Sequence, residues 1–428
     1  MERYRFVQYG STFFLLLGIL VMFLSLALMP AAVSAGEMEM LLDKLVKKGV
    51  LTQGDADEIA KETKQAAAQK EKAEQQKKQE DTKTAGFPDW VRTMKLGGDL
   101  RLRYQGEDTE NDGTGTRSRG RIRLRFGAEA QPAEGWTAGL RIATGSGDPR
   151  STNNTMDNTF EMDQIRVDLA FARYKPLPWL SLVGGKFENP MFRPSDLLWD
   201  TDITPEGAAV QLNYPFSKSL DLFFNSGFFV VDESSSGKDP FMWALQPGVN
   251  WKITNDTNLK MGLAYYYFSN VKDNNLDYSS NTNTRVRNPN RLEYGYNAPV
   301  VSAELGFDKI SAFVPYLGFF GEYTKNPDPS DNDTAYITGV KFGHKSIAKL
   351  GDWQFQYSYR RIEKDAWLDT FPDSDFYGGR TGVSGHEAIF TFGLAKNVNV
   401  GLDYYNTRQV RGPENTQHLF QADLNLRF

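Results

Sequence analysis

The chain of 428 residues contains no cysteine and only three histidines. Without cysteine there can be no disulfide framework, no thiolate metal site, no cysteine nucleophile and no covalently attached c-type haem. His344, His386 and His418 share no spacing, so no metal-ligand motif or Ser/His/Asp set stands out. A basic excess is also lacking, because 49 Lys+Arg face 54 Asp+Glu for a net charge of −5. We therefore expect no enzyme, no bound metal or cofactor and no nucleic-acid partner.

Long apolar runs are missing from all but the first part of the chain. A positively charged start and an apolar run over 13–29 precede small residues at 33–35. This order predicts a secretory signal peptide over 1–35, with an uncleaved membrane anchor as the alternative. No run within 90–428 approaches 18 apolar residues, which excludes a helical membrane protein there. Export without cysteine favours a protein of the bacterial envelope.

Residues 36–89 are almost entirely polar. Leu41, Leu42 and Leu45 fall on one side of a short helix, but the good helix formers over 61–83 carry no apolar stripe. The pattern predicts a short N-terminal α-helical, coiled-coil-like periplasmic segment that cannot bury a core of its own. It could contact peptidoglycan or neighbouring subunits through residues 37–84, or it could be a solvated, partly helical tail.

Residues 90–428 alternate between apolar and polar residues with a period of two. Leu100, Leu102 and Tyr104, for example, alternate with Arg101 and Arg103. The same reading places Ile165, Val167, Leu169 and Phe171 on one face of a strand. Sixteen such strands are centred near residues 100, 124, 139, 168, 184, 210, 225, 247, 263, 304, 317, 339, 357, 390, 402 and 423. The pattern is typical of half-buried strands.

The connections between these strands alternate between long and short, beginning with 106–118 and 131–135. Aromatic residues sit beside the short turns, and they are Trp136, Trp179, Tyr214, Trp251 and Trp353. The last strand alternates up to Phe428, as in bacterial outer-membrane barrels. Because unpaired backbone groups are costly in lipid, the sheet must close. We predict an all-β fold, a 16-stranded antiparallel transmembrane β-barrel over 90–428, rather than a soluble all-β protein.

Arginines gather on the polar faces of the first four strands. Strands lie about 4.8 Å apart, so these side chains should form one basic wall of the lumen. The candidate pore-lining arginines are Arg101, Arg103, Arg121, Arg123, Arg125, Arg141 and Arg166. Their candidate partners are Asp99, Glu129, Asp163 and Asp168. The alternative is that these arginines only make structural ion pairs.

The long connection over 187–207 is unusually apolar, with Leu197, Leu198 and Trp199 among several prolines. We expect it to fold into the barrel rather than form an external lid. Its acidic residues should then face the arginines across the narrowest point and create a transverse field. These candidate constriction residues are Glu188, Asp196, Asp200 and Asp202.

Three stretches carry a resemblance to a known family. They are LLDKLVKKGVLTQGDADEI (41–59), LRIATGSGDPRSTNNT (140–155) and GGKFENPMFRPSDLLWDTDITPEGAAVQL (184–212). Together with the layout of signal, polar lead, barrel and terminal Phe, they resemble the bacterial "putative porin" family of outer-membrane β-barrels. The resemblance covers essentially the whole mature chain and implies passive diffusion of small solutes.

These observations predict an outer-membrane porin, expected as a homotrimer in contact with membrane lipid and lipopolysaccharide. Small hydrophilic solutes and ions would diffuse through a charged constriction. Two alternatives stay open: a substrate-selective channel for phosphate or another oxyanion, and a structural tether between the outer membrane and the cell wall. An outer-membrane enzyme, or a sheath for an electron-transfer cytochrome, has less support in the sequence.

Overall fold

The computed structural model describes residues 88–428 apart from 111, 112, 114, 236, 288, 289, 413 and 414, together with residues 47, 52 and 54. The chain divides into two units, Met1–Phe87 and Pro88–Phe428, and the account below concerns the second. The predicted signal peptide and nearly all of the predicted helical lead lie outside the described residues. In the part that is described, no helix combines the length and apolar character needed to cross a membrane.

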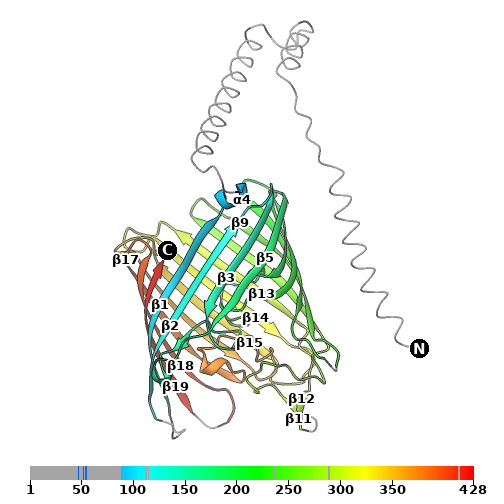
Figure 1. The fold of residues 1–428 in the computed structure, drawn as a ribbon, viewed down its shortest axis with the longest axis vertical. Helices are drawn as coiled ribbons and strands as arrows, with labels where there is room; N and C mark the ends of the chain where they lie inside the picture. The colour runs from blue at the N-terminus through cyan, green and yellow to red at the C-terminus, as the bar shows by residue number, and fades with distance from the viewer. Residues whose placement is uncertain are drawn as a thin grey trace, which may run out of the picture. The chain divides into compact units, whose positions relative to one another are not determined.

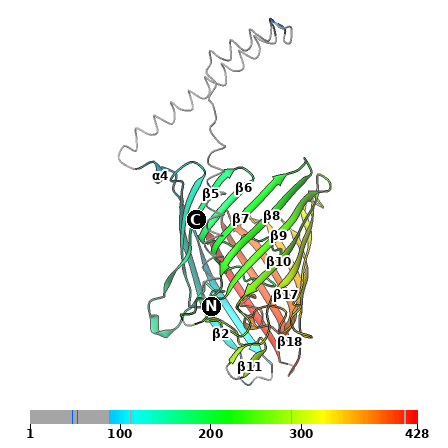
Figure 2. The same ribbon diagram turned by 90° about the vertical axis from the view of Figure 1, so that its right-hand side faces the viewer.

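The described chain forms a closed antiparallel barrel (Figure 1). Its main sheet has 17 strands, and it closes because the first strand pairs with the last as well as with the second. One strand, β4 (Asn154–Thr155), is a two-residue addition beside β2, and the other 16 form the wall, as the alternation predicted. The strands cross the wall at a tilt, which Figure 2 shows from a second side.

The wall strands are β1 (Lys95–Thr109), β2 (Arg117–Ala130), β3 (Trp136–Thr144), β5 (Ile165–Leu177), β6 (Leu180–Lys186), β7 (Glu206–Pro215), β8 (Leu220–Val230), β9 (Phe241–Lys252), β10 (Thr257–Ser269), β13 (Ala298–Asp308), β14 (Tyr316–Lys325), β15 (Thr334–Gly343), β16 (Trp353–Ile362), β17 (Val383–Ala395), β18 (Val398–Gln409) and β19 (Thr416–Arg427). A four-residue helix, α4 (Asp89–Arg92), precedes β1, and a small hairpin of β11 (Arg285–Arg287) and β12 (Asn290–Leu292) lies in a long loop. Two 3₁₀ turns, Asn158–Phe160 and Tyr377–Gly379, lie in other loops.

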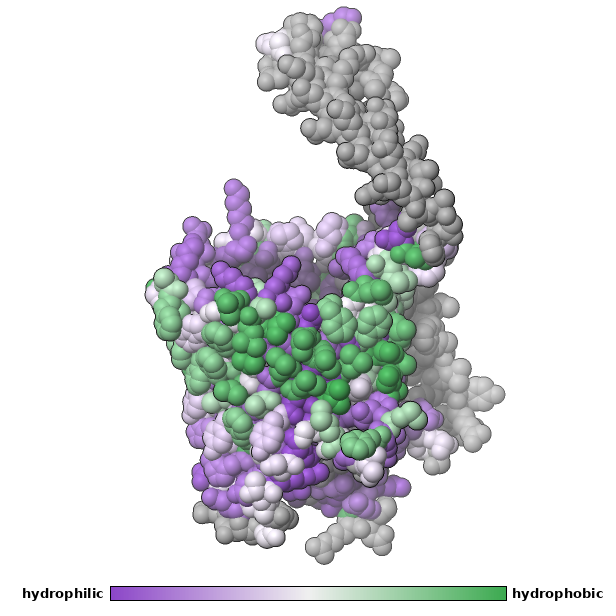
Figure 3. All heavy atoms as spheres, turned by 60° about the vertical axis from the view of Figure 1, so that its left-hand side comes forward, coloured by the Kyte–Doolittle hydropathy of each residue, from purple (hydrophilic) through white to green (hydrophobic). Residues whose placement is uncertain are grey.

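Alternation along each strand separates an apolar outer face from a polar inner face. On β1, Leu102 and Tyr104 are 40% and 51% exposed, whereas Arg103 and Gln105 between and beside them are 7% and 3% exposed. Figure 3 shows the result as an apolar band on the wall between two hydrophilic rims. The five aromatic residues predicted beside the short turns lie at one rim, where Trp136 stacks on Tyr174 with ring centroids 4.6 Å apart. This distribution is that of a lipid-facing surface with an interfacial girdle.

One strand departs from the predicted facing. The pairing of β3 with β5 shifts register at Arg141/Ile142, which leaves Asp168 as an extra residue in β5. Such a bulge turns the following side chains to the other face. Leu169 and Phe171 therefore point into the barrel, 7% and 9% exposed, and the prediction that they share a lipid face with Val167 is wrong.

The two ends of the barrel differ in their connections. Short turns and both ends of the described chain lie at one end, and the loops 187–205, 270–297 and 363–382 extend from the other (Figure 1). The predicted alternation of lengths fails at one point, because the turn 344–352 is longer than the connection 326–333 that precedes it and also longer than the connections 110–116 and 410–415. At the closing seam, Gly98 and Phe428 exchange backbone hydrogen bonds of 2.8 and 3.1 Å. A side chain at Gly98 would overlap the Arg125 carbonyl and the Phe428 ring.

The buried apolar residues lie inside the barrel, where the long loops pack against the inner wall. Phe187, Leu197, Leu198 and Trp199 from the loop 187–205 are at most 3% exposed. They pack in one cluster with residues of the loops 270–297 and 363–382 and with inward residues of β8–β10. The barrel is therefore partly filled, and the loops decide which part of the lumen stays polar.

Candidate functional site: a charged lumen

Six arginines on β1, β2 and β3 form a connected row inside the barrel, here called the arginine wall. They are Arg101, Arg103, Arg121, Arg123, Arg125 and Arg141. The row exists because these positions alternate with lipid-facing residues on neighbouring strands. All six had been predicted to face the lumen together.

Carboxylates from neighbouring strands hold this row in place. Arg123 and Arg125 share Asp99, each at 2.7 Å. The Arg141 Nε donates to Asp168 at 2.5 Å, so the bulged residue of β5 is an ion-pair partner. Asp99 and Asp168 thus act as predicted. Glu129 and Asp163, the other two predicted partners, form no ion pair within the described part of the chain.

Arg166 does not join the arginine wall. Its Nε donates to the Gly145 carbonyl at 3.2 Å and its Nη2 donates to Gln164 at 2.7 Å. It lines a cavity of about 860 Å³ between the loop that follows β3 and the loop 187–205. The prediction of one continuous patch therefore fails at this residue, because it stands before the bulge near the outer end of β5.

The loop 187–205 folds into the barrel, as its apolar content predicted. Trp199 stacks on Phe371 of the loop 363–382, with ring centroids 4.4 Å apart. On the β9 side, the Gln246 amide binds the backbone of Phe192 twice, accepting from its N–H at 2.6 Å and donating to its carbonyl at 2.7 Å. Gln246 is 1% exposed, so this clamp fixes the loop against the wall.

The acidic residues of this loop do not all bind the same partners. Glu188 binds Arg141 at 3.1 Å, and Asp202 binds Arg125 at 3.4 Å and lies 4.0 Å from Arg123. We had expected the acids to face the arginines across an open gap. The arrangement differs because the loop lies against the wall, within reach of the long arginine side chains.

The other two acids of the loop do not touch the arginine wall. Asp200 accepts hydrogen bonds from the backbone N–H groups of Ser374 at 2.8 Å and Asp202 at 2.9 Å. Asp196 binds Arg360 of β16 at 2.9 Å. The loop 187–205 therefore connects three charged or polar regions of the lumen.

Arg360 is the centre of a second group of charges that the sequence reading missed. Its guanidinium contacts Asp196, Asp373 at 3.2 Å, and Glu387 of β17. The three carboxylates, with Arg360, are named the Arg360 cluster. Their oxygens lie within 4.8 Å of one another, the spacing of a metal site, but the guanidinium makes an ion pair with each of them. The sequence could have indicated the inward position of Arg360, because this residue alternates with Tyr357 and Tyr359.

The loop 363–382, from which Asp373 comes, was also missed. Trp367 and Leu368 are fully buried, and Phe376 is 3% exposed. The excess of apolar residues that revealed the loop 187–205 is present here too. Asp369 ties this loop to the loop 270–297 by accepting from the Ser279 hydroxyl at 2.6 Å and the Thr282 backbone at 2.6 Å.

Burial changes the ionisation of the loop carboxyls. Burial, followed by the nearby charge of Asp202, raises the pKa of Asp200 to about 8. Burial and Asp196 raise the pKa of Asp373 well above its usual range despite the opposing effect of Arg360. Burial acts in the same direction on Asp375, but Arg103, Gln421 and Arg121 together outweigh it and lower its pKa. The buried loop carboxyls therefore differ in pKa: burial raises the pKa of Asp200 and Asp373, whereas neighbouring groups lower the pKa of Asp375.

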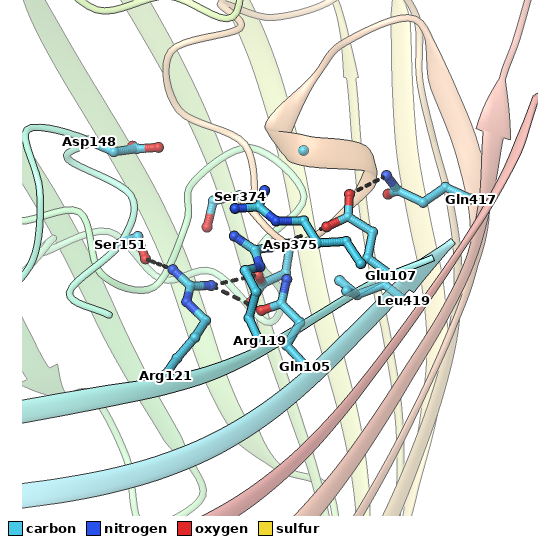
Figure 4. Close-up of a pocket in the computed structure, with 12 residues that line it drawn as sticks. Gln105, Glu107, Arg119, Arg121, Asp148, Ser151, Ser374, Asp375, Gln417 and Leu419 are labelled. Atoms are coloured by element: carbon cyan, nitrogen blue, oxygen red, sulfur yellow. Dashed lines mark hydrogen bonds and ion pairs between the residues drawn. The ribbon is translucent and has the colours of Figure 1, made fainter. Parts of the chain in front are cut away.

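A smaller cavity of about 230 Å³ lies beside the arginine wall (Figure 4). Arg117, Arg119 and Arg121 of β2 line it from one side. Ser374 and Asp375 of the loop 363–382 line it from another. Polar space therefore remains next to β1 and β2, whereas β8–β10 are covered by the packed loops.

The fold and the polar lumen define a transmembrane β-barrel channel protein. The sequence model of the "Putative porin" family matches residues 107–294 and 293–428, so the chain belongs to this family. Family and fold together imply an outer-membrane location. A comparison with curated proteins finds no matching sequence.

A solved porin structure has a similar fold, and two further porin structures are less similar. OprB of Pseudomonas putida, in a structure at high pH, is 14% identical, with a TM-score of 0.54 over 79% of this chain and 95% of that chain. The low-pH structure of the same protein is 11% identical, with a TM-score of 0.49 over 79% and 93%. A triple mutant of the Rhodopseudomonas blastica porin is 10% identical, with a TM-score of 0.43 over 78% and 100%. At these identities the likeness concerns the fold alone.

Proposed function

We propose that the protein is a porin through which small hydrophilic solutes and ions diffuse past a charged constriction, with no covalent step. The observation that carries this proposal is the contact of Asp202 with Arg125 and Arg123, which brings the inward loop 187–205 against the arginine wall. Charges at a narrow, water-restricted point act strongly on passing ions. The constriction residues are those of the arginine wall, with Glu188 and Asp202 from the loop. Asp196, Asp200 and Arg166 lie outside it.

Ion selectivity in a planar bilayer tests this assignment. Replacing Arg121, Arg123 and Arg125 together by Ser should raise the cation-to-anion permeability ratio by roughly threefold to tenfold, because three unit charges leave the lumen. The control replaces three exposed cations outside the lumen, and these are Lys218, Lys396 and Arg408. A reversal potential that stays unchanged in the first variant would reject the constriction.

A substrate-selective oxyanion channel is the second candidate. It is favoured by the run of arginines at every second residue of β2 from Arg117 to Arg125, which could pass an anion from one guanidinium to the next. Conductance that saturates with the concentration of phosphate, but not of chloride, would favour this candidate over general diffusion.

We further propose that the protein is a homotrimer surrounded by membrane lipid and lipopolysaccharide, and that residues 37–84 contact peptidoglycan. A tether would be the main role if deletion of 37–84 impaired envelope integrity and left the conductance intact. Crosslinking of the purified protein in detergent tests the trimer.

A further inference from the structure

The acidic residues that line the cavity beside β2 are all held in ion pairs. Among its acids, Glu107 is paired with Arg119 at 3.2 Å, and Asp148 is paired with Arg150 at 3.2 Å. Asp375 is paired with Arg103 at 2.9 Å. Each carboxylate on the lining therefore has a cation of its own.

The lining arginines are less completely satisfied. The Arg117 side chain is exposed and forms no ion pair or hydrogen bond within the described residues. Arg121 approaches Asp375 only at 3.9 Å. The Nε atoms of Arg119 and Arg121 are buried, and neither has a hydrogen-bond partner in the described chain. Buried donors without partners are uncommon, so the chain itself satisfies these two guanidinium groups incompletely. The lining holds three arginines and three carboxylates. Because Arg103 and Arg150 from outside the lining hold Asp375 and Asp148, Arg117 is left without a carboxylate of its own.

Uncharged polar groups complete the lining. The Arg121 guanidinium donates to the Gln105 amide at 3.0 Å and to the Ser151 hydroxyl at 3.3 Å. Ser374 and Gln417 also face the cavity (Figure 4). Hydroxyl and amide groups next to guanidinium groups can bind the hydroxyls of a solute whose carboxylate the arginines hold.

We propose that this cavity is a binding subsite for a small hydroxylated carboxylate, such as a sugar acid. Its volume of about 230 Å³ corresponds to roughly eight water molecules at about 30 Å³ each. Inorganic phosphate would fill only a small part of that space, and a drug-sized ligand would need a larger pocket of about 300 Å³ or more. The subsite rests on the proposed channel function and names a class of solute for it.

Gluconate is the probe, added to one side of a planar bilayer that contains the full-length protein in potassium chloride. We expect a concentration-dependent, saturable reduction of the chloride current, with little effect from acetate or glucose at the same concentration. Arg117→Gln should weaken the apparent affinity for gluconate by about threefold or more. Arg408→Gln, which removes an exposed arginine of β18 outside the cavity, should leave it unchanged.

Three outcomes would overturn the subsite. Block by gluconate that persists unchanged in the Arg117→Gln protein would place the binding elsewhere. Block by phosphate at lower concentration than gluconate would replace the hydroxylated carboxylate by an inorganic oxyanion. Equal block by glucose would remove the need for the carboxylate. Failure of the wild-type protein to conduct chloride at all is a different result, which would reject the channel function itself.

Discussion

The arginine wall and the Arg360 cluster are both made of arginines and carboxylates inside one barrel, but they differ in their access to water. The side chains of the arginine wall range from 6% exposed at Arg103 to 22% exposed at Arg141, with Arg125 at 21%. In the Arg360 cluster the side chains of Arg360, Glu387 and Asp373 keep 3%, 3% and 8%, and Asp196 alone keeps 25%. Charges next to water can act on a passing ion, whereas charges sealed by packed loops mainly act on each other. On the proposed function, the arginine wall therefore serves conduction, whereas the Arg360 cluster anchors the loops.

Breaking the buried cluster should have the largest effect on stability. Arg360→Met leaves Asp196, Asp373 and Glu387 close together without their cation, which should cost about 3–5 kcal/mol. Urea unfolding in detergent, followed by tryptophan fluorescence, measures the loss. Arg125→Met is the matched variant from the arginine wall, because this side chain is 21% exposed and Asp99 would keep Arg123 as a partner. We expect that variant to lose no more than about 1 kcal/mol. Equal losses in the two proteins would contradict the comparison.

Detaching the loop that connects both regions should have an intermediate effect. Gln246→Ala removes the amide that binds the Phe192 backbone on both sides and leaves buried polar groups unpaired, at a cost of about 1–3 kcal/mol. The loop 187–205 should then be cut faster by an added protease, and single-channel current should become noisier. Gln211→Ala is the control, because that amide makes only one bond to the loop, at 3.2 Å to the Pro190 carbonyl. Cleavage at the same rate in both variants would argue against the clamp.

The sequence predicted the parts of this arrangement that the bilayer imposes. A wall with lipid outside and water inside requires alternation, so the 16 strands and the inward arginines could be located without coordinates. The bulge at Asp168 could not, because an extra residue leaves the local alternation intact and only the pairing with β3 reveals it.

The pairing of the loop acids depends on the path of the chain inside the barrel, which no periodicity encodes. Asp196 and Asp202 stand six positions apart in one loop, yet they bind arginines on β16 and β2. The inward loop 363–382 is a different matter. Trp367, Leu368 and Phe371 give it the same apolar excess that identified the loop 187–205, so this part of the site was readable from the sequence.

The smallest expected effect is a pH dependence of loop docking. It is expected at Asp200, in the loop 187–205 that connects the arginine wall and the Arg360 cluster. Its pKa of about 8 in the folded protein is above the ordinary value of 3.8, so the carboxyl holds a proton between these values only when the loop is docked. The free energy that holds the loop in its docked position therefore falls as the pH rises from about 4 to 8. Above about pH 8 the carboxyl is ionised in both the docked and the undocked loop, and the docking free energy no longer changes. Conductance recorded from pH 6 to 9 should show more frequent fluctuations at the alkaline end.

Asp200→Asn, which carries no charge at any pH, should flatten that dependence, whereas Asp163→Asn, in an exposed part of another loop, should retain it. Fluctuations that rise equally in both variants would mean that a group other than Asp200 controls the docking of the loop.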